Sequence, residues 1–144
     1  MIKEPVSGHP SLEIAVAMLE AADLPSSDLT DAHMAHFFYS GPASAPIGLV
    51  GVELCGANAL LRSLVVAPTQ RSAGIGSALV THAEAYARAH GAKSMFLLTT
   101  TAEAFFKRRG YAAAIRDEAS AEIRVTQEFA GICPASSAFL AKQL

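Results

Sequence analysis

Two runs of residues decide the fold of this chain: Leu61-Arg62-Ser63-Leu64-Val65-Val66-Ala67-Pro68 and, after a short turn, Arg71-Ser72-Ala73-Gly74-Ile75-Gly76. The first run is apolar and predicts a β-strand that ends in a proline turn. The second is a glycine-bearing loop that opens into a helix. The N–H groups and the dipole at a helix start bind phosphate or pyrophosphate, and small residues let the backbone approach such an anion closely. The sequence therefore predicts a site for a phosphate-bearing cofactor.

Length and composition favour one globular domain over residues 1–144. Half of the residues are hydrophobic and only 17% are charged, which argues against disorder. The sequence shows neither an export signal nor an apolar run of the roughly 20 residues that cross a membrane. A formal charge of -2 argues against a nucleic-acid partner. Cys55 and Cys133 form neither a disulfide framework nor a metal pattern, so we expect reduced thiols, a cytoplasmic protein, no metal and a small-molecule partner.

Periodicity and turn residues predict the secondary structure. Expected strands lie near residues 2–7 and at 36–39, 47–54, 60–66, 93–99, 111–115 and 137–141, and expected helices at 11–22, 75–90 and 117–130. Thr100 to Glu103 has capping-box spacing for a further short helix that ends at Gly110. The strand–helix–strand order over residues 60–99 implies one parallel pair in an otherwise antiparallel sheet. The fold class is then mixed α/β, a three-layer sandwich with helices on both faces of the sheet.

Three motifs in this order resemble the GNAT superfamily of acyl-CoA N-acyltransferases. They are a strand that ends in Val66-Ala67-Pro68, the loop Arg71-x-x-Gly74-x-Gly76, and the segment from Ala102 to Tyr111. Within the family, residues 97–101 and 128–137 are similar to the arsenic-resistance-associated N-acetyltransferases, which in turn look like the synthases that acetylate glutamate. The resemblance implies an acetyl-CoA-dependent N-acetyltransferase. By analogy with such families, a homodimer is an open alternative to a monomer.

The resemblance also implies which residues hold coenzyme A. The loop and helix start would bind the pyrophosphate through backbone donors, although Ser72 stands where many family members have glycine. The strand would separate from its parallel neighbour, so that its backbone pairs with the pantetheine arm and one N–H polarises the thioester carbonyl. The implied cofactor-binding residues are Leu64, Val65, Val66, Arg71, Ser72, Ala73, Gly74, Ile75, Gly76, Ser77, Phe106 and Arg109. The alternative for the loop is a glycine-rich turn that only packs the helix on the sheet.

The catalytic groups are less evident in the sequence. Many family members carry a glutamate on the fourth strand, but this chain has Leu60 and Arg62 there. Glu53 is the nearest substitute for a general base, with a solvated strand-end carboxylate as the alternative reading and His36 as a weaker candidate. The family's usual tyrosine falls on Phe106, which cannot protonate a thiolate, so water is the expected proton source.

Arg62 is the most informative residue for the acceptor. We expect it on the same face of the strand as Leu64, pointing into the acceptor groove, where it would bind a carboxylate or an oxyanion of arsenic or phosphorus. The alternative is pairing with a structural carboxylate. Thr99 and Thr100 are further candidates for substrate contact, although capping of the next helix explains Thr100 equally well.

Two function hypotheses follow from these observations. The first is N-acetylation of a small amine, such as an acidic amino acid or its arsenic or phosphorus analogue. The second is a non-catalytic acyl-CoA sensor or interaction module, for which Phe106 and the missing family glutamate leave room. A Rossmann-type nucleotide site fits poorly, because the loop does not follow the first strand.

Overall fold

A seven-stranded sheet forms the centre of the molecule in the computed structural model, which describes residues 5–70, 74–132 and 137–144. Its strands are β1 (Val6–Gly8), β2 (Phe37–Ser40), β3 (Gly48–Cys55), β4 (Asn58–Val66), β5 (Ser94–Thr99), β6 (Ala112–Ala113) and β7 (Ala138–Gln143). They lie in the order β1-β2-β3-β4-β5-β7-β6. Only β4 and β5 are parallel, and every other described pair is antiparallel. The predicted mixed fold is confirmed.

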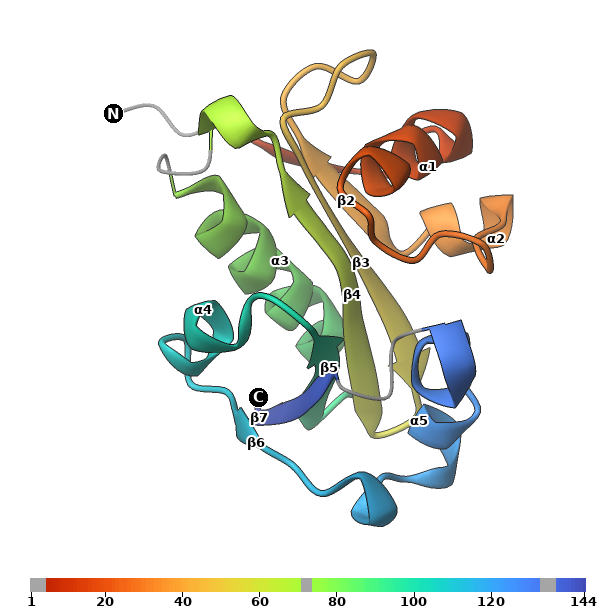
Figure 1. The fold of residues 1–144 in the computed structure, drawn as a ribbon, viewed down its shortest axis with the longest axis vertical. Helices are drawn as coiled ribbons and strands as arrows, with labels where there is room; N and C mark the ends of the chain where they lie inside the picture. The colour runs from red at the N-terminus through yellow and green to blue at the C-terminus, as the bar shows by residue number, and fades with distance from the viewer. Residues whose placement is uncertain (1–4, 71–73, 133–136) are drawn as a thin grey trace.

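Helices cover both faces of this sheet (Figure 1). The α-helices are α1 (Leu12–Ala21), α2 (Asp31–Met34), α3 (Ile75–Ala89), α4 (Glu103–Lys107) and α5 (Ala121–Arg124). Further helical turns are η1 (Pro68–Gln70), η2 (Arg116–Glu118) and η3 (Glu128–Ile132). In Figure 1, α3 and α4 lie on one side of the sheet and α1, α2 and α5 on the other. The structure is therefore the three-layer sandwich that the sequence predicts.

The long helix α3 packs closely on the sheet. Its apolar residues Ile75, Leu79, Ala83 and Ala87 recur every four residues and are all buried, as the sequence predicts. Gly48 of β3 makes this contact possible, because a Cβ there would lie 2.8 Å from Leu79 and 2.9 Å from Ile75. The close contact fixes the start of α3 against the end of β4.

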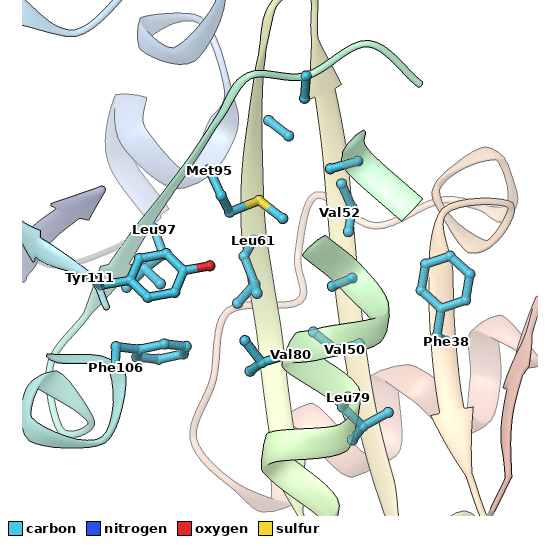
Figure 2. Close-up of a cluster of buried hydrophobic side chains, with 14 of the residues drawn as sticks. Phe38, Val50, Val52, Leu61, Leu79, Val80, Met95, Leu97, Phe106 and Tyr111 are labelled. Atoms are coloured by element: carbon cyan, nitrogen blue, oxygen red, sulfur yellow. The ribbon is translucent and has the colours of Figure 1, made fainter. Parts of the chain in front are cut away.

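The largest core cluster lies between α3, α4 and the sheet (Figure 2). Leu61 of β4 and Leu97 of β5 point into it, and the rings of Phe106 and Tyr111 lie side by side there. The two ring centroids are 5.5 Å apart at an interplanar angle of 74°. Tyr111 is only 3% exposed and belongs to this core. The packing holds α4 beside the two parallel strands.

Two predictions about helices are wrong. The expected helix over residues 117–130 is instead three short pieces, η2, α5 and η3, and Ser120 caps α5 by accepting a hydrogen bond from the N–H of Ile123. The expected capping box does not form either, because the N-cap of α4 is Ala102. Thr99 Oγ1 accepts the N–H of Ala102 at 3.0 Å instead, so the chain leaves β5 in a tight turn before the helix starts.

Other predicted elements agree with the structure apart from their ends. The helix expected at residues 11–22 is α1, which Ser11 caps, and Gly91 follows α3 at a φ of 91°. The strand expected over residues 111–115 is reduced to β6. The expected first strand begins at Val6, and residues 2–4 of that prediction lie outside the described part of the chain. No helix in the described ranges combines the length and apolar character needed to span a membrane.

Candidate active site

A cleft of about 1070 Å³ opens between β4 and β5 and reaches the start of α3. The parallel ladder between the two strands ends at the pair Leu60↔Phe96, although β4 continues to Val66 and β5 to Thr99. Beyond that pair, β4 stays bonded to β3, and β5 stays bonded to β7. The two strands therefore separate, as the sequence resemblance implies, and the end of β4 forms a wall of the cleft.

The start of α3 forms one end of the cleft. Gly74, Gly76 and Ser77 line it, and Gly74 is the N-cap, with a φ of 78° that favours glycine. No side chain caps this helix start in the described part of the chain. Ile75 of the predicted cofactor loop is buried against the core rather than among the cleft-lining residues. Arg71, Ser72 and Ala73 of the same prediction lie outside the described residues.

Arg109 lies close to this helix start. Its Nε donates to Ser77 Oγ at 3.0 Å and its Nη1 donates to the carbonyl of Phe105 at 2.9 Å. The guanidinium also lies 3.6 Å from the centroid of the Phe105 ring. Phe106 is 4% exposed and lines the cleft. A fixed positive charge and the positive end of a 15-residue helix thus meet at one end of the cleft.

A β-bulge interrupts β4 within the cleft. After the pair Gly51↔Arg62 the next pair is Leu49↔Val65, so β4 holds one residue more than β3 across this step. Ser63 lies in the bulge with a φ of 60°, in the left-handed region that serine rarely adopts. Because the extra residue shifts the alternation, Leu64 packs in the cluster under α3 while Arg62 points to the opposite side of the sheet. The prediction that Arg62 and Leu64 share a face is wrong for this reason.

Arg62 is almost completely buried, and three carboxylates surround it. Its Nη1 and Nη2 bind Asp28 at 2.5 and 2.9 Å, its Nη1 also binds Glu53 at 3.0 Å, and its Nε lies 3.2 Å from Glu128. The Nε also donates to Ser63 Oγ at 3.0 Å. The Arg62 side chain is 1% exposed. The guanidinium thus connects β4 to β3, to the segment before α2 and to η3.

These contacts stabilise the charged forms of the buried pair. Burial alone would raise the pKa of Asp28, but the hydrogen bond and the charge of Arg62 outweigh it, and the pKa lies below its ordinary value of 3.8. For Arg62, burial alone would lower the pKa. The hydrogen bond to Asp28 and the charge of Glu128 outweigh that effect, so the pKa of Arg62 lies above its ordinary value. Both side chains are therefore charged at neutral pH.

The other sequence-predicted catalytic and substrate residues are placed as follows. Glu53, on β3, is not among the residues that line the cleft, and it accepts the hydrogen bond from Arg62 described above. His36 lies further away on the α3 side, with its Nδ1 2.5 Å from the hydroxyl of Tyr86. Thr99 and Thr100 both line the cleft. The structure thus brings Arg62 and Glu53 together and places the threonines across the cleft from β4.

The two cysteines differ in what the structure describes. Cys55 is a buried free thiol, as expected. Burial first, and then the charges of Glu53 and Glu122, raise the pKa of this thiol to about 11. Cys133 lies outside the described residues. Among the residues that the structure describes, no group of three or more His, Cys, Asp or Glu side chains is arranged to hold a metal ion.

Sequence reasoning missed Asp28, Glu128, Ser63 and Ser137. Asp28 and Arg62 are 34 positions apart in the chain, and only the fold brings them together. Ser137 lines the cleft at 5% exposure, and its Oγ has no hydrogen-bond partner among the described residues. The sequence contained no signal for the positions of these four residues. It indicated only that Arg62, if buried in an apolar strand, requires carboxylate partners.

Comparison with known proteins agrees with this geometry. Residues 13–111 match the Acetyltransferase (GNAT) family, which is well over half of the chain. This chain therefore belongs to the GNAT family of acetyltransferases. Helix α3, the parallel pair and the cleft between its strands all lie within the matched range, apart from the cleft residues Glu128 and Ser137.

Individual relatives give the following matches. An amino-acid acetyltransferase of Ralstonia nicotianae is 46% identical over 55 residues, which cover 38% of this chain and 12% of that protein. An N-acetylglutamate synthase from Neisseria gonorrhoeae was solved with coenzyme A and N-acetyl-glutamate. Its structural match covers 100% of this chain and 36% of the synthase chain, with a TM-score of 0.83 and 21% sequence identity. A protein from Mycobacterium tuberculosis, solved with CoA, covers 97% of this chain and 99% of its own, with a TM-score of 0.73 and 16% identity. The chain spans only part of the first two proteins.

Proposed function

We propose that this chain transfers an acetyl group from acetyl-CoA to the amine of a small molecule, by direct attack of the amine on the thioester in a ternary complex. One observation carries the proposal. The parallel strands β4 and β5 separate after Leu60↔Phe96 and open a cleft that ends at the start of α3. A cleft between separating parallel strands offers strand-edge backbone groups and a helix start to a single extended ligand.

The residues at the start of α3 fit the pyrophosphate of coenzyme A. Gly74 and Gly76 leave the backbone accessible, and a Cβ added at Gly76 would lie 3.3 Å from the Phe105 ring. Arg109 is held there by Ser77 and would add a positive charge. The loop residues Arg71, Ser72 and Ala73 belong to the same proposed site. Coenzyme A would supply the activated thioester, and the protein would supply its binding and orientation.

Backbone groups of β4 would hold the rest of the cofactor. Leu64, Val65 and Val66 line the cleft on the stretch of β4 that β5 does not pair with. The pantetheine arm would add to this edge like a further strand. One N–H of the stretch would donate to the thioester oxygen as negative charge develops on it, and a donor of this kind contributes about 3 to 4 kcal/mol in other acyl-transfer enzymes.

The acceptor amine must lose a proton before it attacks. An alkyl amine with a pKa of about 10.4 is neutral in only about one molecule in 2,500 at pH 7. Glu53 remains our candidate for the base, acting through water because it does not line the cleft. Its hydrogen bond to Arg62 occupies Oε2 and leaves Oε1 for such a water. Phe106 has no proton to give, so water would protonate the leaving thiolate.

An amino acid is the proposed class of acceptor. Support comes from the similarity to an amino-acid acetyltransferase over 55 residues. Acidic amino acids and their arsenic or phosphorus analogues remain the narrower candidates, with Thr99 and Thr100 as the proposed contacts. The carboxylates around Arg62 favour the other reading of that residue, in which it pairs within the protein.

Calorimetry and a thiol-release assay together test this function. The protein should bind acetyl-CoA, and it should release free thiol with at least one member of a panel of amino acids, arsenical and phosphorus-containing analogues, polyamines and aminoglycosides. Gly76→Val should abolish binding because its side chain would enter the cleft, whereas Ala85→Val, on the same helix outside the cleft, should bind normally. Binding without turnover across the panel would favour the non-catalytic alternative, and absence of binding would overturn both.

A further inference from the structure

Ser63 is held in a conformation that costs energy, at the point where β4 enters the cleft. Its φ of 60° lies in the left-handed region, which a side chain with a Cβ disfavours. Such residues persist only where their surroundings fix them, and they cluster at functional sites. Ser63 is 9% exposed and lines the cleft. The next two residues, Leu64 and Val65, are those that the proposed function places along the thioester.

The side chain of Arg62 fixes this conformation. Its Nε donates to Ser63 Oγ at 3.0 Å, so the bulge is bonded to the residue directly before it. Arg62 cannot move away, because Asp28 holds both of its terminal nitrogens and Glu53 and Glu128 bind it from two other segments. A planar guanidinium can hold Asp28 and Ser63 at the same time because it presents donors in several fixed directions.

We propose that Arg62 is a positioning residue, which fixes Ser63 in its left-handed conformation and thereby sets the direction of the peptide groups of Leu64 and Val65 in the cleft. The proposal rests on the proposed function, in which those peptide groups contact the thioester. It assigns the buried guanidinium to the protein's own Ser63 hydroxyl and carboxylates rather than to the carboxylate of an acceptor. The two roles predict different patterns of loss across acceptors.

A matched pair of variants at Ser63 tests the conformational part. Ser63→Ala keeps the Cβ that disfavours a positive φ but loses the hydroxyl, so kcat should fall by about tenfold. Ser63→Gly also loses the hydroxyl, yet glycine adopts this φ freely, so its loss should stay within about threefold. An unchanged kcat in Ser63→Ala, or equal losses in the two variants, would overturn the proposal.

Variants of the Arg62 partners test the role of the guanidinium. Asp28→Asn and Arg62→Lys should lower kcat to the same extent for acidic and neutral acceptors, with an unchanged KM for acetyl-CoA. Arg62→Lys keeps the charge opposite Asp28 but cannot bind Asp28 and Ser63 together in the same way. A loss confined to the KM of acidic acceptors would assign Arg62 to the substrate and contradict the positioning role.

Amide hydrogen exchange separates this inference from the proposed function. Ser63→Ala should speed exchange at Leu64 and Val65 by about tenfold and leave exchange in the centre of α3 unchanged, whether or not the protein acetylates anything. Unchanged exchange at both amides would refute the positioning role even in an active enzyme. Absence of turnover in the wild-type protein, with altered exchange in the variant, would remove the proposed function alone.

Discussion

Two buried ionic groups lie on opposite sides of the sheet and differ in composition. On the side of α1 and α5, Arg62 is surrounded by Asp28, Glu53 and Glu128. On the side of α3, Glu84 accepts a hydrogen bond from the Tyr111 hydroxyl at 2.9 Å and binds Lys142 Nζ at 3.1 Å. The Arg62 group reaches the cleft, whereas Glu84, Tyr111 and Lys142 are not among its lining residues.

The difference concerns what each group connects. The Glu84 group joins α3 to the end of β7 and to the residue before β6, which are elements of the packed core. The Arg62 group joins β4 and β3 to the segment before α2 and to η3, which meet beside the cleft. Burial of charge is costly in both places, and in both it is offset by pairing with opposite charges. The two groups therefore differ in position, because one lies under α3 in the packed core and the other beside the cleft.

The largest effect should follow from removal of the central cation. Arg62→Met leaves several carboxylates buried without their partner, and we expect the free energy of unfolding to fall by about 3 to 5 kcal/mol. Urea denaturation of the wild type and of the variant measures this change, provided that the two proteins have the same m-value. A loss below about 1 kcal/mol would mean that the carboxylates find water or another partner. The Arg62 group would then contribute no more to stability than the Glu84 group.

A smaller effect is expected on the other side of the sheet. Glu84→Gln keeps a hydrogen-bond acceptor for Tyr111 but loses the charge opposite Lys142, whose side chain is 28% exposed. We expect a loss of about 1 to 2 kcal/mol in stability. Acetyl-CoA affinity and kcat should not change, because no member of this group lines the cleft. A change in either quantity would show that the two sides of the sheet are coupled.

Acid titration should separate the two groups further. The pKa of Asp28 in the folded protein lies below its ordinary value of 3.8, so the stability that its pairing contributes is complete above that value and is lost as the pH falls through the lower, folded pKa. The stability difference between the wild type and Asp28→Asn should therefore be constant at neutral pH and shrink in strong acid. Denaturation curves from pH 7 to pH 2 measure it, and a difference that grows in acid would contradict the pairing.

The smallest effect is expected at the unpartnered hydroxyl. Ser137→Ala removes an Oγ that lacks a hydrogen-bond partner among the described residues, and the main-chain carbonyl of residue 137 keeps its bond from Arg116 at 2.5 Å. Stability should stay within about 0.5 kcal/mol of the wild type or rise slightly, because no bond is broken. A thermal melt decides this. A clear loss of stability would reveal a bound water or another partner at this hydroxyl.

The sequence predicted those features that repeat or end at recognisable residues. Helix α3 follows from apolar residues at every fourth position, and the parallel pair follows from the strand–helix–strand order. The bulge was not predictable because Ser63 is not a residue that signals a positive φ. The expected shared face of Arg62 and Leu64, which lie on either side of the extra residue, was therefore wrong.

The chain after β6 was predicted less well for a different reason. Residues 117–130 contain no glycine or proline that would end a helix, yet Ser120 starts α5, which ends at Arg124. Contacts of η3 with the sheet, such as that between Phe129 and Phe139, compete with helix formation there. Tertiary packing of this kind overrides local propensity and leaves no local signal. Glu128, which lines the cleft, lies in η3, so this part of the cleft wall depends on these contacts.

Gly51 shows how one position can restrict how the chain evolves. It pairs with Phe37 on one side and with Arg62 on the other, and a Cβ at this position would lie 2.4 Å from the Phe37 ring. No substitution at Gly51 is tolerable unless Phe37 becomes smaller in the same step. A mutant library built to alter the acceptor preference should hold this glycine and phenylalanine constant. A single substitution at Gly51 would disturb the packing of the sheet, and the variant would be lost for that reason rather than for its acceptor preference.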